Sequence, residues 1–136
     1  MTRDEIMVFI NANPTCYLAT VDGDAPHVRA MGMNRADERG ILFQLSTLKG
    51  MCRELLKNGK IELSYTGSGK MIRTSGTADC VEGQSFKEEV LGALPFLKPL
   101  VDDHGWEALK VFRVASPVAM VRTMATNLES REFVKL

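Results

Sequence analysis

The spacing of apolar residues near the start of the chain predicts a short helix. Thr2 and Glu5 have the spacing of a capping box, in which each side chain bonds a backbone N–H of the first turn. Three apolar residues then fall on one helical face, as in a helix that packs on a core. The helix is expected to end at Asn13–Pro14, because the residue before a proline avoids the helical conformation. The apolar residues are Ile6, Phe9 and Ile10.

The pattern then changes to that of strands. β-branched and apolar residues predict three strands over 16–21, 27–35 and 41–45. Turn-forming residues separate these strands at 22–24 and 37–40. Because such short turns join strands that lie side by side, we expect the three strands to be antiparallel neighbours.

A helical period returns after the third strand. Five apolar residues have the spacing of a buried stripe, and Asn58–Gly59, with Lys57 in the preceding turn, forms a typical helix end. The expected stripe consists of Leu48, Met51, Cys52, Leu55 and Leu56.

The second half of the chain repeats both patterns. Strands are predicted over 61–66, 71–82, 111–114 and 118–124, the last two bent apart at Ser116–Pro117. A helix is predicted over 84–94 with an inner face of Phe86, Val90, Leu91 and Leu94. Pro95 and Pro99 are expected to break the chain before a second short helix over 102–109.

These elements predict a mainly β fold with flanking helices. About seven mostly antiparallel strands indicate a closed or partly closed barrel rather than a doubly wound sheet. The 136 residues suit a single domain over 1–136, with no internal repeat or linker.

Composition narrows the possible functions. The 17 basic and 17 acidic side chains cancel, so no overall field favours nucleic acid or an anionic membrane. The longest apolar runs are too short to span a membrane, and the first residues lack the pattern of a signal peptide. Three separated cysteines and two histidines predict free thiols and no metal site, which is typical of a cytoplasmic protein.

The most informative segment joins the third strand to the amphipathic helix. Ser46 or Thr47 is the expected N-cap, and the start of a helix carries free N–H groups and a partial positive charge. The first turn carries Lys49, while the first acid is Glu54. Hydroxyls, open amides and a lysine together indicate a phosphate-binding segment. The alternative is that Lys49 simply points into water.

A second candidate lies on the strand over 26–35. Alternation places Arg29 on one face with His27, Met31, Met33 and Arg35. A guanidinium among apolar residues needs a carboxylate or a ligand anion, and its planar shape suits a phosphate. The alternatives are an ion pair with a Glu or Asp of a neighbouring strand, or simple exposure on the outer face of the barrel.

Other motifs in the sequence carry weaker indications of function. Gly67-Ser68-Gly69-Lys70 fails the Walker pattern because Ser64 and Met71 stand where that pattern needs Gly and Ser or Thr. A hairpin loop is the better interpretation. No nucleophile, zinc-binding or paired-carboxylate motif is present, so no catalytic residue is predicted.

The order of these elements resembles the pyridoxamine 5′-phosphate oxidase-like, FMN-binding split-barrel family, most of all its short members near the nitroimidazole-resistance proteins. Four stretches carry the resemblance: 16–26 matches the first strand and turn, 26–31 the arginine-bearing second strand, 46–58 the phosphate segment with its helix, and 71–78 the long central strand. Residues 127–136 do not match the substrate-recognising end of the authentic oxidase, so pyridoxamine phosphate is not the expected substrate.

The resemblance implies a six- to seven-stranded antiparallel Greek-key split β-barrel. It also implies a homodimer with noncovalent FMN at the interface. By position, Arg29, Ser46, Thr47 and Lys49 would hold the phosphate, and Ala30, Met31 and Gln44 would lie along the ribityl chain or ring. The hypothesis is an FMN-dependent oxidoreductase acting on an unknown small molecule. The alternatives are a non-catalytic flavin-binding module (sensor, store or electron carrier) and a flavin-free barrel that binds another phosphorylated metabolite or a partner.

Overall fold

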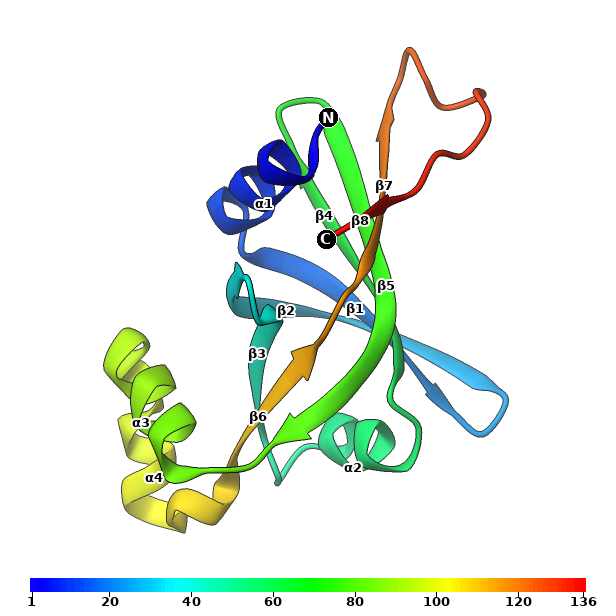
Figure 1. Cartoon of the computed structure of the whole chain (residues 1–136). Coiled ribbons are helices and arrows are strands. Elements are labelled where there is room, and N and C mark those ends of the chain that lie inside the picture. Colours follow the sequence, from blue (N-terminus) through cyan, green and yellow to red (C-terminus); the bar gives the residue numbers. More distant parts are fainter.

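Six antiparallel strands close into a barrel in the computed structural model, which describes residues 1–136 (Figure 1). The strand order around the barrel is β4-β1-β2-β3-β6-β5, and β5 also pairs with β4 to close the ring. The strands are β1 (Thr15–Asp22), β2 (Ala25–Asp37), β3 (Gly40–Ser46), β4 (Lys60–Gly67), β5 (Lys70–Val81) and β6 (Leu109–Val114). The expected fold class is confirmed.

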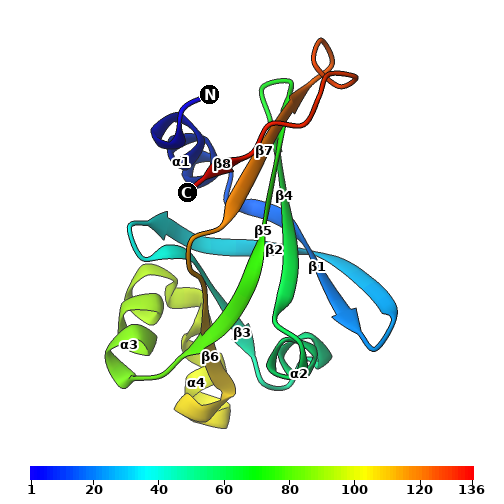
Figure 2. The ribbon, with the colours of Figure 1, turned by 45° about the vertical axis from the view of Figure 1, so that its right-hand side comes forward.

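Two further strands extend the sheet beyond the barrel. β7 (Val118–Thr123) pairs with the first half of β5, and β8 (Val134–Lys135) pairs with β7. β8 was not predicted, because two residues in a polar tail carry no periodic signal. Both chain ends lie near α1 (Arg3–Ala12), at the end of the molecule away from α2 (Gly50–Lys57) (Figures 1 and 2).

The first helix forms as predicted. In α1 the Thr2 side chain accepts from the Glu5 backbone N–H, and the Glu5 carboxylate accepts from the Thr2 N–H, so the capping box is confirmed. Ile6 and Ile10 are buried against the barrel. Asn13 is the C-cap, as Asn13–Pro14 indicated.

The second helix differs from its prediction at both ends. α2 begins at Gly50, so Leu48 precedes the helix and is 65% exposed, and Leu56 is 56% exposed. The face of α2 that packs on the barrel is centred on Met51 and Leu55, and Leu56 lies at the edge of that face. The expected stripe is therefore wrong at Leu48 and Leu56 and confirmed at Met51, Cys52 and Leu55.

A helical segment connects β5 to β6. It contains α3 (Gln84–Ala93), a 3-10 turn η1 (Pro95–Leu97), α4 (Lys98–His104) and a 3-10 turn η2 (Trp106–Ala108). α4 begins before Pro99, and the expected helix over 102–109 was placed too late. A proline in a first turn lacks only an N–H that has no partner there, so Pro95 and Pro99 start helical turns rather than break them.

A β-bulge in β2 corrects one assignment of faces. The register against β3 shifts between Met33 and Arg35, which reverses the alternation beyond that point. Met33, before the shift, is buried, whereas Arg35, beyond it, does not share the face of Arg29 and Met31. Arg35 instead lies with its Nε 2.9 Å from an oxygen of Asp37.

The core fills the barrel between α1 and α2. Phe43 and Phe112, on neighbouring strands, stack with their ring centroids 5.7 Å apart and their planes at 13°. Leu18, Leu63 and Ile72 are fully buried beside them. None of the helices is long and apolar enough to cross a bilayer.

Candidate functional site

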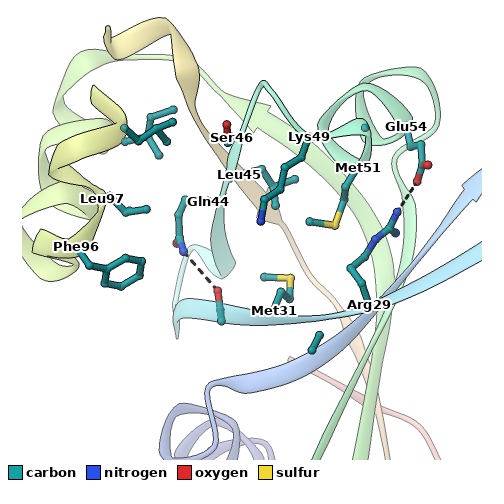
Figure 3. Close-up of a pocket in the computed structure, with 15 residues that line it drawn as sticks. Arg29, Met31, Gln44, Leu45, Ser46, Lys49, Met51, Glu54, Phe96 and Leu97 are labelled. Carbon is teal, nitrogen blue, oxygen red and sulfur yellow. Dashed lines mark hydrogen bonds and ion pairs between the residues drawn. The ribbon is translucent and has the colours of Figure 1, made fainter. Parts of the chain in front are cut away.

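A pocket opens where β2 and β3 separate. β2 pairs with β3 only from Met33 to Asp37, whereas the end of β3 from Gln44 to Ser46 pairs with β6. The edge of β2 from Arg29 to Gly32 consequently has no strand partner on that side. A cavity of about 700 Å³ lies in this split, within the size range of small-molecule sites (Figure 3). The pocket is lined by Arg29, Ala30, Met31, Gly32, Gln44, Leu45, Ser46, Lys49, Gly50, Met51, Glu54, Phe96, Leu97, Leu100 and Leu109.

The pocket brings together most of the residues that the sequence singled out. Arg29, Ala30, Met31, Gln44, Ser46 and Lys49 all line it. Thr47 does not. Its side chain is exposed, and its backbone N–H donates to the carbonyl of Ala108 at 2.9 Å.

The start of α2 differs from the expected cap. Lys49 is the N-cap and makes no side-chain capping bond, so neither Ser46 nor Thr47 caps the helix. The Ser46 hydroxyl instead accepts from the Leu48 N–H at 3.1 Å and shapes the turn before the helix. The first turn of α2 contains no acid, as expected. Lys49 has no carboxylate within ion-pair distance, so its ammonium is the uncompensated cation of the pocket.

Arg29 has an internal carboxylate partner, as in one of the alternatives, but the acid lies on α2 and not on a neighbouring strand. Its Nη2 lies 2.9 Å from Glu54 Oε2, and its Nη1 donates to the Thr20 hydroxyl. Arg29 shares a face with Leu18 and Thr20, because cross-strand partners of β1 and β2 point the same way. This face leaves the apolar core at Thr20 and meets Glu54 of α2.

Glu54 is the centre of this polar cluster. Its side chain is 10% exposed and accepts from the Thr20 hydroxyl at 2.6 Å and from His27 Nδ1 at 2.8 Å, besides Arg29. The hydrogen bonds from Thr20, His27 and Arg29, in that order, lower the pKa of Glu54 from 4.5 to about 2. The carboxylate can therefore only accept, which places a proton on His27 Nδ1. This role of Glu54 was not predicted, since an acid in mid-helix normally faces water.

Gln44 bridges the split. Its Nε2 lies 3.5 Å from the Gly32 carbonyl, and its Oε1 is buried without a hydrogen-bond partner. A buried acceptor without a donor costs free energy, about 1–3 kcal/mol in proteins. A ligand N–H or O–H in the pocket would satisfy it.

The far end of the pocket is apolar. Phe96 and Leu97 of η1 and Leu100 of α4 line it, opposite the Arg29–Glu54 end (Figure 3). Phe96 is 70% exposed, although a phenyl ring is normally buried. This apolar wall was not predicted from the sequence. The available signal was Phe96 and Leu97 directly after Pro95, apolar residues in a segment interpreted as a break.

His27 and Glu54 also approach Asp22. One ligand atom from each of the three residues lies within 4.8 Å of the others. The guanidinium of Arg29 on Glu54 disfavours a divalent cation there, because two positive charges would share one carboxylate. The hydrogen bonds described above account for the approach of His27 to Glu54.

Comparisons with known proteins agree with the geometry. The family described as pyridoxamine 5′-phosphate oxidase matches residues 2–116. No curated protein sequence matches the chain. A NimC/NimA family protein from Clostridium acetobutylicum is similar in structure, with a TM-score of 0.80 at 25% sequence identity, over 98% of this chain and 92% of that one.

Two more distant structures share the fold. One is a protein related to general stress protein 26 of B. subtilis, from Clostridium acetobutylicum, with a TM-score of 0.73 at 16% identity over 98% of this chain and 93% of that one. The other is HutZ, the heme storage protein from Vibrio cholerae, with a TM-score of 0.60 at 19% identity over 85% of this chain and 90% of that one.

Proposed function

This chain belongs to the pyridoxamine 5′-phosphate oxidase family, and we propose on that basis that it binds FMN in the pocket between β2 and β3. The single observation that carries the proposal is the combination of an uncompensated Lys49 and an orphaned Gln44 Oε1 in one cavity. FMN offers an anion for the first and ring N–H and hydroxyl donors for the second.

The residues present fit the cofactor. Lys49 and Ser46, at the turn before α2, would hold the phosphate, with Arg29 adding positive charge from β2. Ala30, Met31 and Gln44 would lie along the ribityl chain or ring, and the small Ala30 and Gly32 let a flat group approach the unpaired edge of β2.

Flavin fits these residues better than haem does. Haem iron is usually held by His, Cys, Tyr or Met. Of these residue types, only Met31 and Met51 line the pocket, and Met51 is buried. HutZ is described as a heme storage protein, so the absorbance of the purified chain must separate the two cofactors.

An oxidoreductase acting on a small molecule is the function that the pocket supports best. Bound flavin would supply electron or hydride transfer. The chain's own residues would bind and orient the flavin and keep water out. The apolar wall of Phe96, Leu97 and Leu100 covers one end of the pocket, and Lys49 provides positive charge away from that wall. No side chain is required as an acid or base.

A non-catalytic flavin-binding module is the second candidate. The observation that favours it is that Glu54, the only acid lining the pocket, has its carboxylate engaged by three partners. Turnover with NADH or NADPH and an electron acceptor supports the oxidoreductase. Bound flavin without turnover supports the binding module.

We also propose a homodimer with the pocket at its interface. The outer face of the β1–β2 hairpin exposes Tyr17 (52%) and Val28 (70%), and Ala30 on the same face lines the pocket. A second copy that covered this face would also close the open side of the cavity. Sedimentation equilibrium should give twice the chain mass of 15.1 kDa. A monomer at all concentrations would contradict the dimer.

The decisive experiment is spectroscopic. The protein is purified, stripped of bound small molecules and mixed with FMN, riboflavin or haem in separate titrations. We expect FMN to bind with quenched fluorescence and more tightly than riboflavin, which lacks the phosphate. A chain that binds neither flavin contradicts the proposed function.

A further inference from the structure

We propose that the small molecule that joins the flavin in this pocket is uncharged and largely apolar, an aromatic compound rather than a phosphate ester or a carboxylate. This inference rests on the proposed function and deepens it by naming the class of substrate. It makes the apolar wall, formed by Phe96 and Leu97 of η1 and Leu100 of α4, the part of the pocket that selects the substrate.

The first support is the uneven distribution of charge in the pocket. Arg29, Lys49 and Glu54 are its only charged lining residues, and they belong to β2, to the N-cap of α2 and to α2 itself. The apolar wall lies at the opposite end and offers no charged group (Figure 3). A charged substituent placed against this wall would lose its hydration without gaining a partner, which is unfavourable.

The second support is the direction of the charged side chains in the helical segment that carries the wall. Lys98 follows Leu97 directly but pairs with Asp102 at 2.6 Å, and the Lys87 Nζ donates to the Trp106 carbonyl at 2.9 Å. No charged residue of this segment lines the pocket. The wall is therefore uncharged because the neighbouring charged side chains point elsewhere.

The third support is the charge of the pocket once FMN is bound as proposed. Two cations and one acid line the pocket, so the net charge of its side chains is one positive unit. A phosphate monoester carries about 1.5 to 2 negative charges at neutral pH. The loaded pocket then has no surplus positive charge, so it does not attract a second anion.

The fourth support is the fixed position of an exposed aromatic ring. Pro95 begins η1 and restricts its own φ, and the Leu97 N–H donates to the Leu94 carbonyl at 3.0 Å. Phe96 is held between them in this turn and is nevertheless 70% exposed. An aromatic ligand would cover this ring, and aromatic pairs are more favourable than their buried area alone implies.

The test titrates 2-naphthol and 2-naphthoate separately into protein that is saturated with FMN. The two probes share one ring system, and only the naphthoate is charged at neutral pH. Isothermal titration and the change in flavin absorbance measure both affinities without any turnover. Saturation with FMN removes the effect of any difference in flavin affinity between the proteins.

The variants change the charge of the wall. Phe96→Lys introduces a cation, and Phe96→Met is the matched variant that keeps the wall uncharged. Phe133→Lys is the control for a cation elsewhere, because Phe133 is 61% exposed and does not line this pocket. Leu97→Lys replaces Phe96→Lys if that variant no longer binds FMN.

We expect the wild type to bind 2-naphthol about tenfold or more tightly than 2-naphthoate, because the carboxylate has no partner at the wall. Phe96→Lys should lower this preference by about fivefold or more, because its ammonium attracts the carboxylate. Phe96→Met and Phe133→Lys should keep the preference within about threefold of the wild type.

A wild type that binds FMN but shows no preference for 2-naphthol, or binds neither probe, overturns this inference and leaves the proposed function intact. A preference that is unchanged in the lysine variant of the wall also overturns it, because the probe then binds elsewhere. A wild type that binds no flavin refutes the proposed function, and this inference with it.

Discussion

Glu54 Oε2 and Arg29 Nη2 lie 2.9 Å apart where α2 meets the inner face of the β1–β2 hairpin. The pair joins an element at the end of the barrel to the unpaired edge of β2. It also places an acid in a pocket that the sequence predicted to attract anions.

The ionisation of Glu54 predicts a dependence of stability on pH. Its carboxyl pKa is lowered to about 2 in the folded chain, from a value of 4.5. A lowered pKa means that the stabilisation is fully present above about pH 4.5 and is lost as the pH falls towards 2. The difference in melting temperature between wild type and Glu54→Gln should be constant above pH 5 and shrink below it.

Carbon-detected NMR of the Glu54 carboxyl measures the same pKa directly. A midpoint near 4.5 would show that the hydrogen bonds from Thr20, His27 and Arg29 do not form in solution.

Lys49→Ala should weaken FMN binding by about 1–3 kcal/mol, the scale of a lost charge-assisted hydrogen bond. Riboflavin binding should change little, because riboflavin carries no phosphate. Lys57→Ala is the matched control, since Lys57 lies on the same helix in its last turn and does not line the pocket. Fluorescence titration measures all the affinities. Equal losses for Lys49→Ala and Lys57→Ala would mean that the phosphate is not at the start of α2.

Phe96→Ala should lower the affinity for FMN and riboflavin by the same factor, because Phe96 lies at the apolar end of the pocket. Its melting temperature should stay near that of the wild type, since a side chain that is 70% exposed contributes little to stability. Phe133→Ala is the control, because Phe133 is 61% exposed and lies outside this pocket. A loss confined to FMN would place the phosphate, not the ring, beside Phe96.

Gly40→Ala should destabilise the chain by about 3 kcal/mol or more. Gly40 has a φ of +114°, and an added methyl group would overlap the carbonyl oxygen of Val114. Gly69→Ala is the matched control, with a φ of +72° and no neighbouring atom within 4 Å. It should lose only about 1–2 kcal/mol, the cost of a left-handed conformation. Urea unfolding distinguishes the two, and equal losses would contradict the close approach at Val114.

Local patterns predicted most of the fold. The capping box at Thr2 and Glu5 and the turn between β1 and β2 depend on residues close in sequence, so periodicity and turn chemistry were sufficient. Leu48 and Leu56 were assigned wrongly because they fit the helical spacing, while the actual start and face of α2 depend on how it covers the barrel.

The site was predictable only in part. Lys49 and Arg29 carry local signals, an uncompensated cation at a helix start and a cation within a strand. The partner of Arg29 is 25 residues away, and no pattern ties Glu54 to it. The wall containing Phe96 was missed because prolines that begin helical turns look in the sequence like prolines that end them.

The bulge between Met33 and Arg35 lets the two halves of β2 direct their side chains to different parts of the molecule. The half before it presents Arg29 and Met31 to the cavity, and the half after it carries Arg35, which pairs with Asp37 and with Glu89 of the helical segment. Deleting a single residue at the bulge would reverse the direction of the side chains in the second half of β2 and break the ion pairs of Arg35. The side chains of the first half would keep their direction. Ligand preference and helix anchoring can thus be altered independently along a continuous stretch of backbone.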